Sequence, residues 1–222
     1  MRLLNLVALA AFVLPGCASV QERPVAAPPT APDTLVAAQI PQIPEGLRPV
    51  IQADYDASPR TAYTLVVGSA GRGWASHSGR GSWSASERTR VALQRCEHYA
   101  QGPCILVMAN GRLTGRTAPE PRALTYPTRF DATAVPFLND AQKAELGARY
   151  PTARQHRAIA IWRLGGFAWV VGRPSAAEAQ RDALQNCQRF GDGNRPCFLY
   201  SVDDQVVFTP QTDISDAIRP RP

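Results

Sequence analysis

The pattern of hydrophobic and polar positions in this chain occurs twice. Alternating apolar residues over 63–67, and again over 158–162, predict β-strands. Each run is followed by a glycine turn and by a second apolar stretch that begins near Trp74 in the first copy and near Phe167 in the second. Each half of the pattern therefore predicts a β-hairpin.

A helix is predicted after each hairpin, because Ser84 with Glu87, and Ser175 with Glu178, form Ser-x-x-Glu capping boxes. The two helix sequences align at an offset of 91 residues, with eight identities in the first thirteen positions. Small and apolar residues at helical spacing give each helix one face that can be buried. These residues are Ala92, Cys96 and Tyr99 in the first helix, and Ala183, Cys187 and Phe190 in the second.

Beyond each helix, apolar runs over 105–109 and 198–202 predict a third strand. Asn110-Gly111 is a strong two-residue hairpin signal, and Asp203-Asp204 occupies its place in the second copy. Closing strands are predicted over 112–115 and 205–209. The sequence thus predicts an α+β fold with two tandem ββαββ modules, each a small antiparallel sheet with one helix across one face.

The segments outside this repeat differ in composition. Eight prolines lie between residues 18 and 59, where no hydrophobic period persists, so we expect a disordered tether. A short helix is predicted over 140–149 as the leading element of module two, with a face made of Leu138, Ala141, Leu146 and Tyr150. The expected boundaries are 1–17 for a signal peptide, 18–59 for the tether, 60–117 for module one, 118–130 for a linker, 131–209 for module two and 210–222 for a C-terminal tail.

The first seventeen residues are similar to a bacterial lipoprotein signal peptide. Arg2 precedes an apolar run that is shorter than the about 20 residues needed to span a bilayer. The run ends in Leu14-Pro15-Gly16-Cys17, which resembles a lipobox, although Pro15 departs from the usual Ala or Ser. The resemblance implies that Cys17 carries acyl chains such as palmitate and anchors the protein in a membrane. The absence of Asp after Cys17 implies sorting to the outer membrane. The alternative is an ordinary cleaved signal peptide with an incidental cysteine.

The other four cysteines, Cys96, Cys104, Cys187 and Cys197, recur at the same place in both copies. An exported chain meets an oxidising compartment, so we expect the disulfides 96–104 and 187–197. Each would close a short loop and contribute roughly 2.5 kcal/mol to a module that is small for a self-sufficient core.

These cysteines allow two other interpretations. Cys96, His98 and Cys104 could supply three zinc ligands, but the second copy has Arg189 in the place of His98. A redox pair is the other alternative, although no Cys-x-x-Cys motif occurs. We therefore expect neither a metal nor a cofactor.

Motifs for catalysis are scarce. His77 beside Ser76 and Ser78 is the one neighbourhood in the sequence that combines a nucleophile with a base, and adjacency in sequence is weak support for a catalytic pair. Glu87 and Glu178 are assigned to helix capping. We therefore expect a protein that is not an enzyme.

The positive charge of the chain suggests acidic partners. The sequence has 24 basic and 18 acidic residues. An exported protein rarely meets nucleic acid, so an acidic cell-wall polymer or another envelope protein is the expected partner besides the membrane. Arginines lie near two tryptophans in module one, a combination that suits acidic glycans or a protein hot spot. The candidate binding residues are Arg72, Trp74, Arg80, Trp83, Arg88, Arg90 and Arg95. The alternatives are that Trp74 packs in the core and that Trp83 forms a hydrophobic staple before the helix.

The whole pattern, a hairpin followed by Ser-x-x-Glu-Ala, Ala-Leu-x-x-Cys and a later cysteine, resembles a widespread class of exported bacterial domains of unknown function. Module one departs from it at Arg88, where module two has Ala179. The resemblance implies architecture and location. We therefore expect a non-catalytic envelope lipoprotein that presents two recognition or scaffolding modules in the periplasm or at the cell surface. The alternative is an enzyme, or an enzyme accessory, that acts on a cell-wall polymer.

Overall fold

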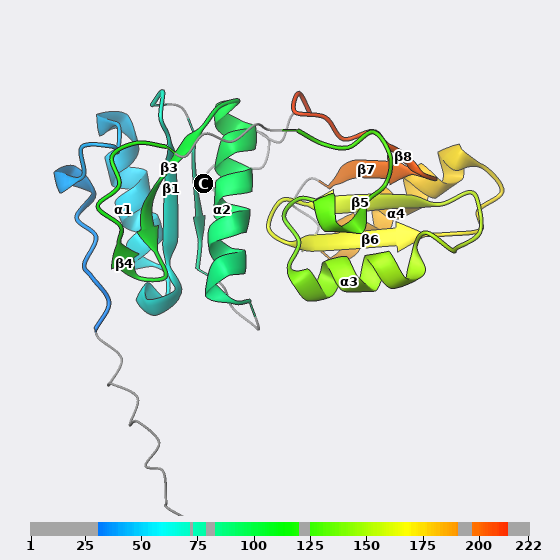
Figure 1. Cartoon of the computed structure of the whole chain (residues 1–222), viewed down its shortest axis with the longest axis horizontal. Helices are drawn as coiled ribbons and strands as arrows, with labels where there is room; N and C mark the ends of the chain where they lie inside the picture. The colour runs from blue at the N-terminus through cyan, green and yellow to red at the C-terminus, as the bar shows by residue number, and fades with distance from the viewer. Residues whose placement is uncertain (1–30, 72, 79–82, 120–124, 191–196, 213–222) are drawn as a thin grey trace, which may run out of the picture. The chain divides into compact units, whose positions relative to one another are not determined.

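The two halves of the chain form antiparallel sheets of the same topology (Figure 1). The computed structural model describes residues 31–71, 73–78, 83–119, 125–190 and 197–212. The first sheet has the strand order β2-β1-β3-β4, and the second has the order β6-β5-β7-β8. The strands are β1 (Thr64–Gly68), β2 (Trp74–His77), β3 (Cys104–Ala109), β4 (Arg112–Leu113), β5 (Ala158–Trp162), β6 (Gly166–Val170), β7 (Phe198–Val202) and β8 (Gln205–Val206). The predicted α+β fold with two tandem ββαββ modules is confirmed.

One helix crosses the equivalent face of each sheet, α2 (Ala85–Ala100) in module one and α4 (Ala176–Phe190) in module two. Ala92 and Ala183, which are counterparts in the repeat, are fully buried between helix and sheet. Small side chains at these positions let each helix lie close to its sheet.

The predicted helix caps are present. Ser84 Oγ accepts a hydrogen bond from the Glu87 N–H at 3.2 Å, and Glu87 Oε2 accepts one from the Ser84 N–H at 2.5 Å, so the capping box of α2 is complete. In α4, the Glu178 N–H donates to Ser175 Oγ at 3.2 Å. These bonds satisfy backbone donors that a helix start would otherwise leave unpaired.

Both predicted disulfides are confirmed. Cys96 is bonded to Cys104, with a Cα–Cα distance of 6.2 Å, and Cys187 is bonded to Cys197, with 6.0 Å. Each bond joins the last turns of the helix to the start of the next strand. The six residues before Cys197 lie outside the described residues.

Each sheet is also covered on its second face, which the sequence analysis did not predict. In module one, a helix α1 (Arg48–Asp56) buries Ile51 and Tyr55 against Leu65 and Val67 of β1. Ile51 and Tyr55 are four residues apart, so they share one face of the helix. The sheet of module one therefore forms the middle of three layers.

Module two has the same third layer. The predicted helix over 140–149 is confirmed as α3 (Asp140–Arg149), and Leu146 and Tyr150 pack with Ile159 and Ile161 of β5. Of the four residues predicted for this face, Leu138, Leu146 and Tyr150 are buried, whereas Ala141 is exposed.

Backbone details show that the leading segments of the two modules are counterparts. The Asp33 N–H donates to the Gly111 carbonyl at 2.8 Å, and the Phe130 N–H donates to the Asp204 carbonyl at 2.8 Å. Gly111 and Asp204 occupy equivalent turns between the last two strands of each sheet. The repeated unit is therefore αββαββ, one helix longer than the sequence predicted.

The short 3-10 helices are η1 (Ala37–Gln39), η2 (Glu45–Leu47), η3 (Arg60–Ala62) and η4 (Ala132–Ala134).

Three predicted boundaries need correction. The tether predicted over 18–59 is wrong from residue 31 onwards, because Leu35, Ile43, Ile51 and Tyr55 are buried in the core of module one. Residues 18–30 lie outside the described residues. The end of the linker predicted over 118–130 belongs to module two, since residues 126 and 130 pack against its core. The first residues of the tail predicted over 210–222 contact the C-terminal end of α2, where the Pro210 carbonyl accepts from Gln101 and the Thr212 carbonyl lies against His98.

The leading segment of module one can be tested by mutation. Replacing the fully buried Ile51 with Ala should lower the free energy of unfolding by about 2–5 kcal/mol, because it removes core contacts and leaves a cavity. Val50→Ala, one residue earlier and 40% exposed, should change it by less than about 0.5 kcal/mol. Urea unfolding of both variants measures the difference, and equal effects would mean that residues 31–59 are not part of the folded unit.

Candidate functional site

Helix α2 is buried on two sides. Ala92 and Cys96 face its own sheet, whereas Val91 belongs to the hydrophobic core that contains Phe137 and Leu138 of module two. Val91 has no exposed surface. Fully burying a valine side chain stabilises a structure by roughly 1.5–3 kcal/mol, so this contact joins the modules as part of one core.

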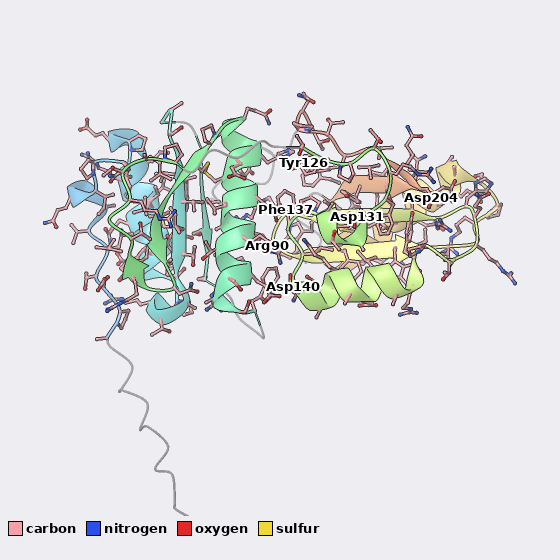
Figure 2. All side chains as sticks on the ribbon, viewed as in Figure 1. Arg90, Tyr126, Asp131, Phe137, Asp140 and Asp204 are labelled. Carbon is pink, nitrogen blue, oxygen red and sulfur yellow. A yellow bond between two sulfur atoms is a disulfide. The ribbon has the colours of Figure 1, made fainter. Side chains whose placement is uncertain are left out.

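Three polar side chains of α2 surround Val91, and we call Glu87, Arg90 and Gln94 the docking triad. Glu87 Oε1 accepts from the Asp140 N–H at 2.7 Å, and Gln94 Oε1 accepts from the Phe137 N–H at 3.1 Å. Arg90 donates to the carbonyl of residue 138 at 3.0 Å and to Asp140 Oδ1 at 2.7 Å (Figure 2). Three of these four contacts are to backbone atoms. The triad therefore binds mainly backbone groups at the start of α3 and depends little on the side chains of that segment.

The electrostatics of Glu87 fit this arrangement. The hydrogen bond from the Asp140 backbone, followed by those from Ser84, lowers the pKa of Glu87 to about 2. The carboxylate is therefore ionised at every physiological pH, and it lies at the first turns of both α2 and α3, where a negative charge is favourable.

A second contact joins the C-terminal end of α2 to later parts of the chain. His98 is buried, its Nδ1 lies 2.9 Å from Tyr126 Oη, and its Nε2 lies 2.6 Å from the Thr212 carbonyl oxygen. The His98 ring stacks on Phe208, with 5.1 Å between the ring centroids. His98 was weighed from sequence as a zinc ligand, and the structure places it in an aromatic cluster instead.

Several described residues of the arginine–tryptophan face expected from sequence make contacts within the molecule. Arg95 is 6% exposed, and its Nη1 donates to the Ser76 carbonyl at 2.5 Å. Burial, and then the charge of Arg163, lower the pKa of Arg95 to about 9. Arg88 donates to the Trp83 carbonyl at 2.6 Å and to Asn110 Oδ1 at 2.7 Å. These guanidinium groups are therefore engaged within the molecule, and the binding face expected from sequence stays a prediction.

The two tryptophans pack against the hydrophobic cores of the protein. Trp74 packs against the core formed with α1, as the alternative interpretation held. Trp83 packs against the core of module two and lies next to Gly165. A Cβ atom on Gly165 would stand 2.5 Å from the indole ring, so glycine is required for this approach, and its φ of +96° also favours glycine. Arg72 and Arg80, the remaining predicted binding residues, lie outside the described residues.

His77, the candidate base of the enzyme alternative, packs against Trp83 in a tilted arrangement, with 4.7 Å between the ring centroids. Burial, and then the positive charges of Arg95 and Arg88, lower the pKa of His77 to about 4. The imidazole is therefore neutral at neutral pH, but it is a weaker base than an ordinary histidine. A general base works best with a pKa near the working pH, so this environment does not favour that role.

Hollows on the surface of the described part of the chain lie away from His77. One, of about 540 Å³, is lined by the leading segment of module one, including Leu35, Val36 and Tyr55. Another, of about 520 Å³, lies along α2 beside Thr89 and Leu93. Their linings are mainly apolar, and the described residues that form them do not include His77.

Neither a metal site nor a membrane-spanning helix is found in the described part of the chain. The sulfur atoms of Cys96 and Cys104 are bonded to each other, so they cannot serve as thiolate ligands in this structure. Within the described ranges, no cluster of three or more His, Cys, Asp or Glu residues is placed to hold a metal ion. No helix among these residues has the length and apolar content needed to cross a bilayer.

Comparison of the chain with known protein families, with curated protein sequences and with solved structures gave no match. The functional residues are therefore judged from their geometry. The sequence analysis named Arg90 as a candidate binding residue and Glu87 as a cap, but it did not predict that they act together with Gln94 as the docking triad, although a signal was present. Arg90 and Gln94 recur as Arg181 and Gln185, and neither a cap nor the sheet core requires them.

The contact that joins the modules through Val91 can be tested by mutation. Helix α4 has Asp182 at the equivalent position, so Val91 is replaced with Asp. Val91→Asp would bury a carboxylate without a partner, so the docking contact should open while both sheets stay folded. Hydrogen exchange over residues 132–146 should rise at least tenfold, whereas β5 and β7 stay protected. Ser86→Asp, at an exposed position of the same helix, is the control and should leave exchange unchanged.

The pKa of His77 predicts a pH effect on stability. The unfolded chain has a histidine with the ordinary pKa of 6.5, so between pH 6.5 and about 4 the unfolded state binds more protons than the folded state. Acidification over this window therefore lowers the free energy of unfolding. His77→Gln should lose less stability than the wild type between pH 7 and pH 5 in urea unfolding. An equal loss of stability in the wild type and in His77→Gln would contradict the lowered pKa of His77. His156→Gln serves as the control substitution.

Proposed function

We propose that this protein is a non-catalytic, lipid-anchored scaffold or recognition protein of the bacterial cell envelope, whose two modules act as one unit. The observation that carries the proposal is the docking of α2 onto module two through Val91 and the docking triad. A contact of this kind fixes the relation between two modules, which a scaffold needs and which a pair of freely linked binding domains would lack.

The use of the arginines favours a protein partner over an acidic polymer. Arg88, Arg90 and Arg95 are engaged within the molecule, so they are not offered as a continuous basic surface. Charged side chains that remain on the surface, such as Arg149 and Arg181, lie near acidic neighbours. A surface of mixed charge suits a specific protein contact better than a uniformly acidic polymer.

The enzyme alternative depends on His77 and the serines beside it. The lowered pKa of His77 and the packing of its ring against Trp83 weaken that interpretation. Hydrolysis of purified cell-wall polymer by the protein, lost in the His77→Gln variant, would favour the enzyme over the scaffold.

The anchor is tested by Cys17→Ala, which removes the residue that would carry the acyl chains. The variant should move from the membrane fraction to the soluble fraction after cell disruption, because a chain without acyl groups has no such anchor. Its two disulfides should still form, since the modules fold independently of residue 17. A variant that remains in the membrane fraction would show that Cys17 is not the anchor.

A further inference from the structure

The sheet of module two has an edge strand with free hydrogen-bonding groups. β6 is the first strand in the order β6-β5-β7-β8, so only one of its sides is paired. In an antiparallel pair, successive residues turn their backbone groups alternately toward the partner strand and away from it. Trp162 and Gly166 close the hairpin between β5 and β6, so Phe167 and Trp169 turn their backbone N–H and C=O groups away from β5. Both residues are partly exposed, and these groups bond to none of the other residues that the structure describes.

The other three edges of the two sheets are blocked at least in part. On each of them, an outer backbone group of the edge strand is bonded to a residue outside the sheet. These bonds run from the Leu113 N–H of β4 to Asp33 Oδ2 at 2.8 Å, from the Val206 N–H of β8 to the Thr128 carbonyl at 3.0 Å, and from Arg95 Nη1 to the Ser76 carbonyl of β2 at 2.5 Å. Natural proteins block sheet edges with such contacts or with charged side chains, because a free edge pairs with further strands. Among the described residues, β6 has no such contact, and its sequence Gly-Phe-Ala-Trp-Val has no charge.

The free groups of β6 require an extended backbone as their partner, and a second β6 supplies one with a matching pattern. When two copies of β6 run antiparallel about a two-fold axis beside Ala168, Phe167 of each strand stands opposite Trp169 of the other. Each such pair can exchange both of its backbone hydrogen bonds, because both residues present N–H and C=O groups at the edge. The side chains of Phe167 and Trp169 project from the same face of the sheet, where aromatic pairs across strands are favourable. The small Ala168 lies at the axis, where the two strands come closest.

Helix α4 crosses the sheet beside this axis. Ala183, in the middle of α4, belongs to the same core cluster as Ala168 of β6. Asp182 accepts a hydrogen bond from Arg173 Nε at 2.6 Å, and Arg173 lies just beyond the end of β6. The flank of α4 that carries Asp182 is therefore on the side of the free edge.

This flank carries opposite charges near its two ends. Glu178 lies four residues before Asp182, and Arg189 lies seven residues after it, so all three side chains line one side of the helix. Neither Glu178 nor Arg189 forms an ion pair with another residue in the described part of the chain. A two-fold axis beside Ala183 makes α4 antiparallel to α4 of the second copy. Glu178 of each copy then lies opposite Arg189 of the other, so opposite charges meet twice.

We propose that β6 of one molecule pairs with β6 of a second copy of this chain in a closed, two-fold symmetric dimer. The contact joins two four-stranded sheets into one continuous sheet, and the ion pairs between the two α4 helices accompany it. The same surface is used on both molecules, so association stops at the dimer. The proposal goes beyond the scaffold function above, because it concerns self-association through module two and holds whether or not Cys17 carries an anchor.

Site-specific photo-crosslinking of the full chain in an exporting bacterial host tests this contact. Gln185 is exposed and lies on the same flank of α4 as Asp182. A benzophenone side chain in its place should give a covalent dimer, and the crosslinked peptide should come from α4. The same group in place of Val50, which is 40% exposed on α1, should give no dimer and serves as the control. A crosslink to another protein, or to a segment outside module two, would overturn the proposal.

Charge exchange sharpens the test. Glu178→Arg and Arg189→Glu should each reduce the yield of dimer several-fold, because each places like charges opposite one another. When the two variants are co-expressed with different tags, a mixed dimer should restore the yield, since both of its ion pairs again join opposite charges. Glu45→Arg, the same charge reversal at an exposed site of module one, should leave the yield unchanged. Formation of both disulfides checks that the variants are folded.

Hydrogen exchange of the purified full chain tests the strand contact itself. The amides of Phe167 and Trp169 should exchange several-fold more slowly as the protein concentration rises and the dimer forms. In the Glu178→Arg variant, the same slowing should require higher concentrations. Absence of a dimer, a mixed pair of variants that stays defective, or exchange at these two amides that does not depend on concentration would each overturn the proposal.

Discussion

The structure depends on a single helix that is buried on both sides. Through Ala92 and Cys96, α2 closes the core of module one, and through Val91 it enters the core of module two. A surface helix normally has one apolar stripe, and its other side faces solvent. Here the second side receives the start of α3, so a change at Val91 affects both modules.

The other features supply what each small module needs for stability. A sheet of four short strands with one helix would leave an apolar face in water, and α1 and α3 cover that face in the two modules. The disulfides then join each central helix to its sheet at the point where the chain turns back. Three layers and a covalent link compensate for the limited core of a module of this size.

Much of the fold could be predicted, because the repeat gave each assignment a second, independent occurrence. The capping serines, the cysteine pairs and the alternating strands all recur, so each prediction was checked within the sequence.

The helix α1 was missed because proline density was taken as a sign of disorder. Pro49 lies in the first turn of α1, where proline is favourable, and Ile51 and Tyr55 carry too short an apolar pattern to stand out. Which arginines face solvent could not be predicted, because charge along the sequence does not tell whether a guanidinium group reaches solvent or a carbonyl, as that of Arg95 does at Ser76.

Coupling between the modules makes the molecule one cooperative unit, and differential scanning calorimetry of the wild type measures this most directly. If α2 belongs to both cores, the modules should unfold in one transition, with a ratio of calorimetric to van't Hoff enthalpy close to one. Two separate transitions, or a ratio of about two, would contradict the account. They would mean that the contacts of Val91 and the docking triad do not hold the modules together in solution.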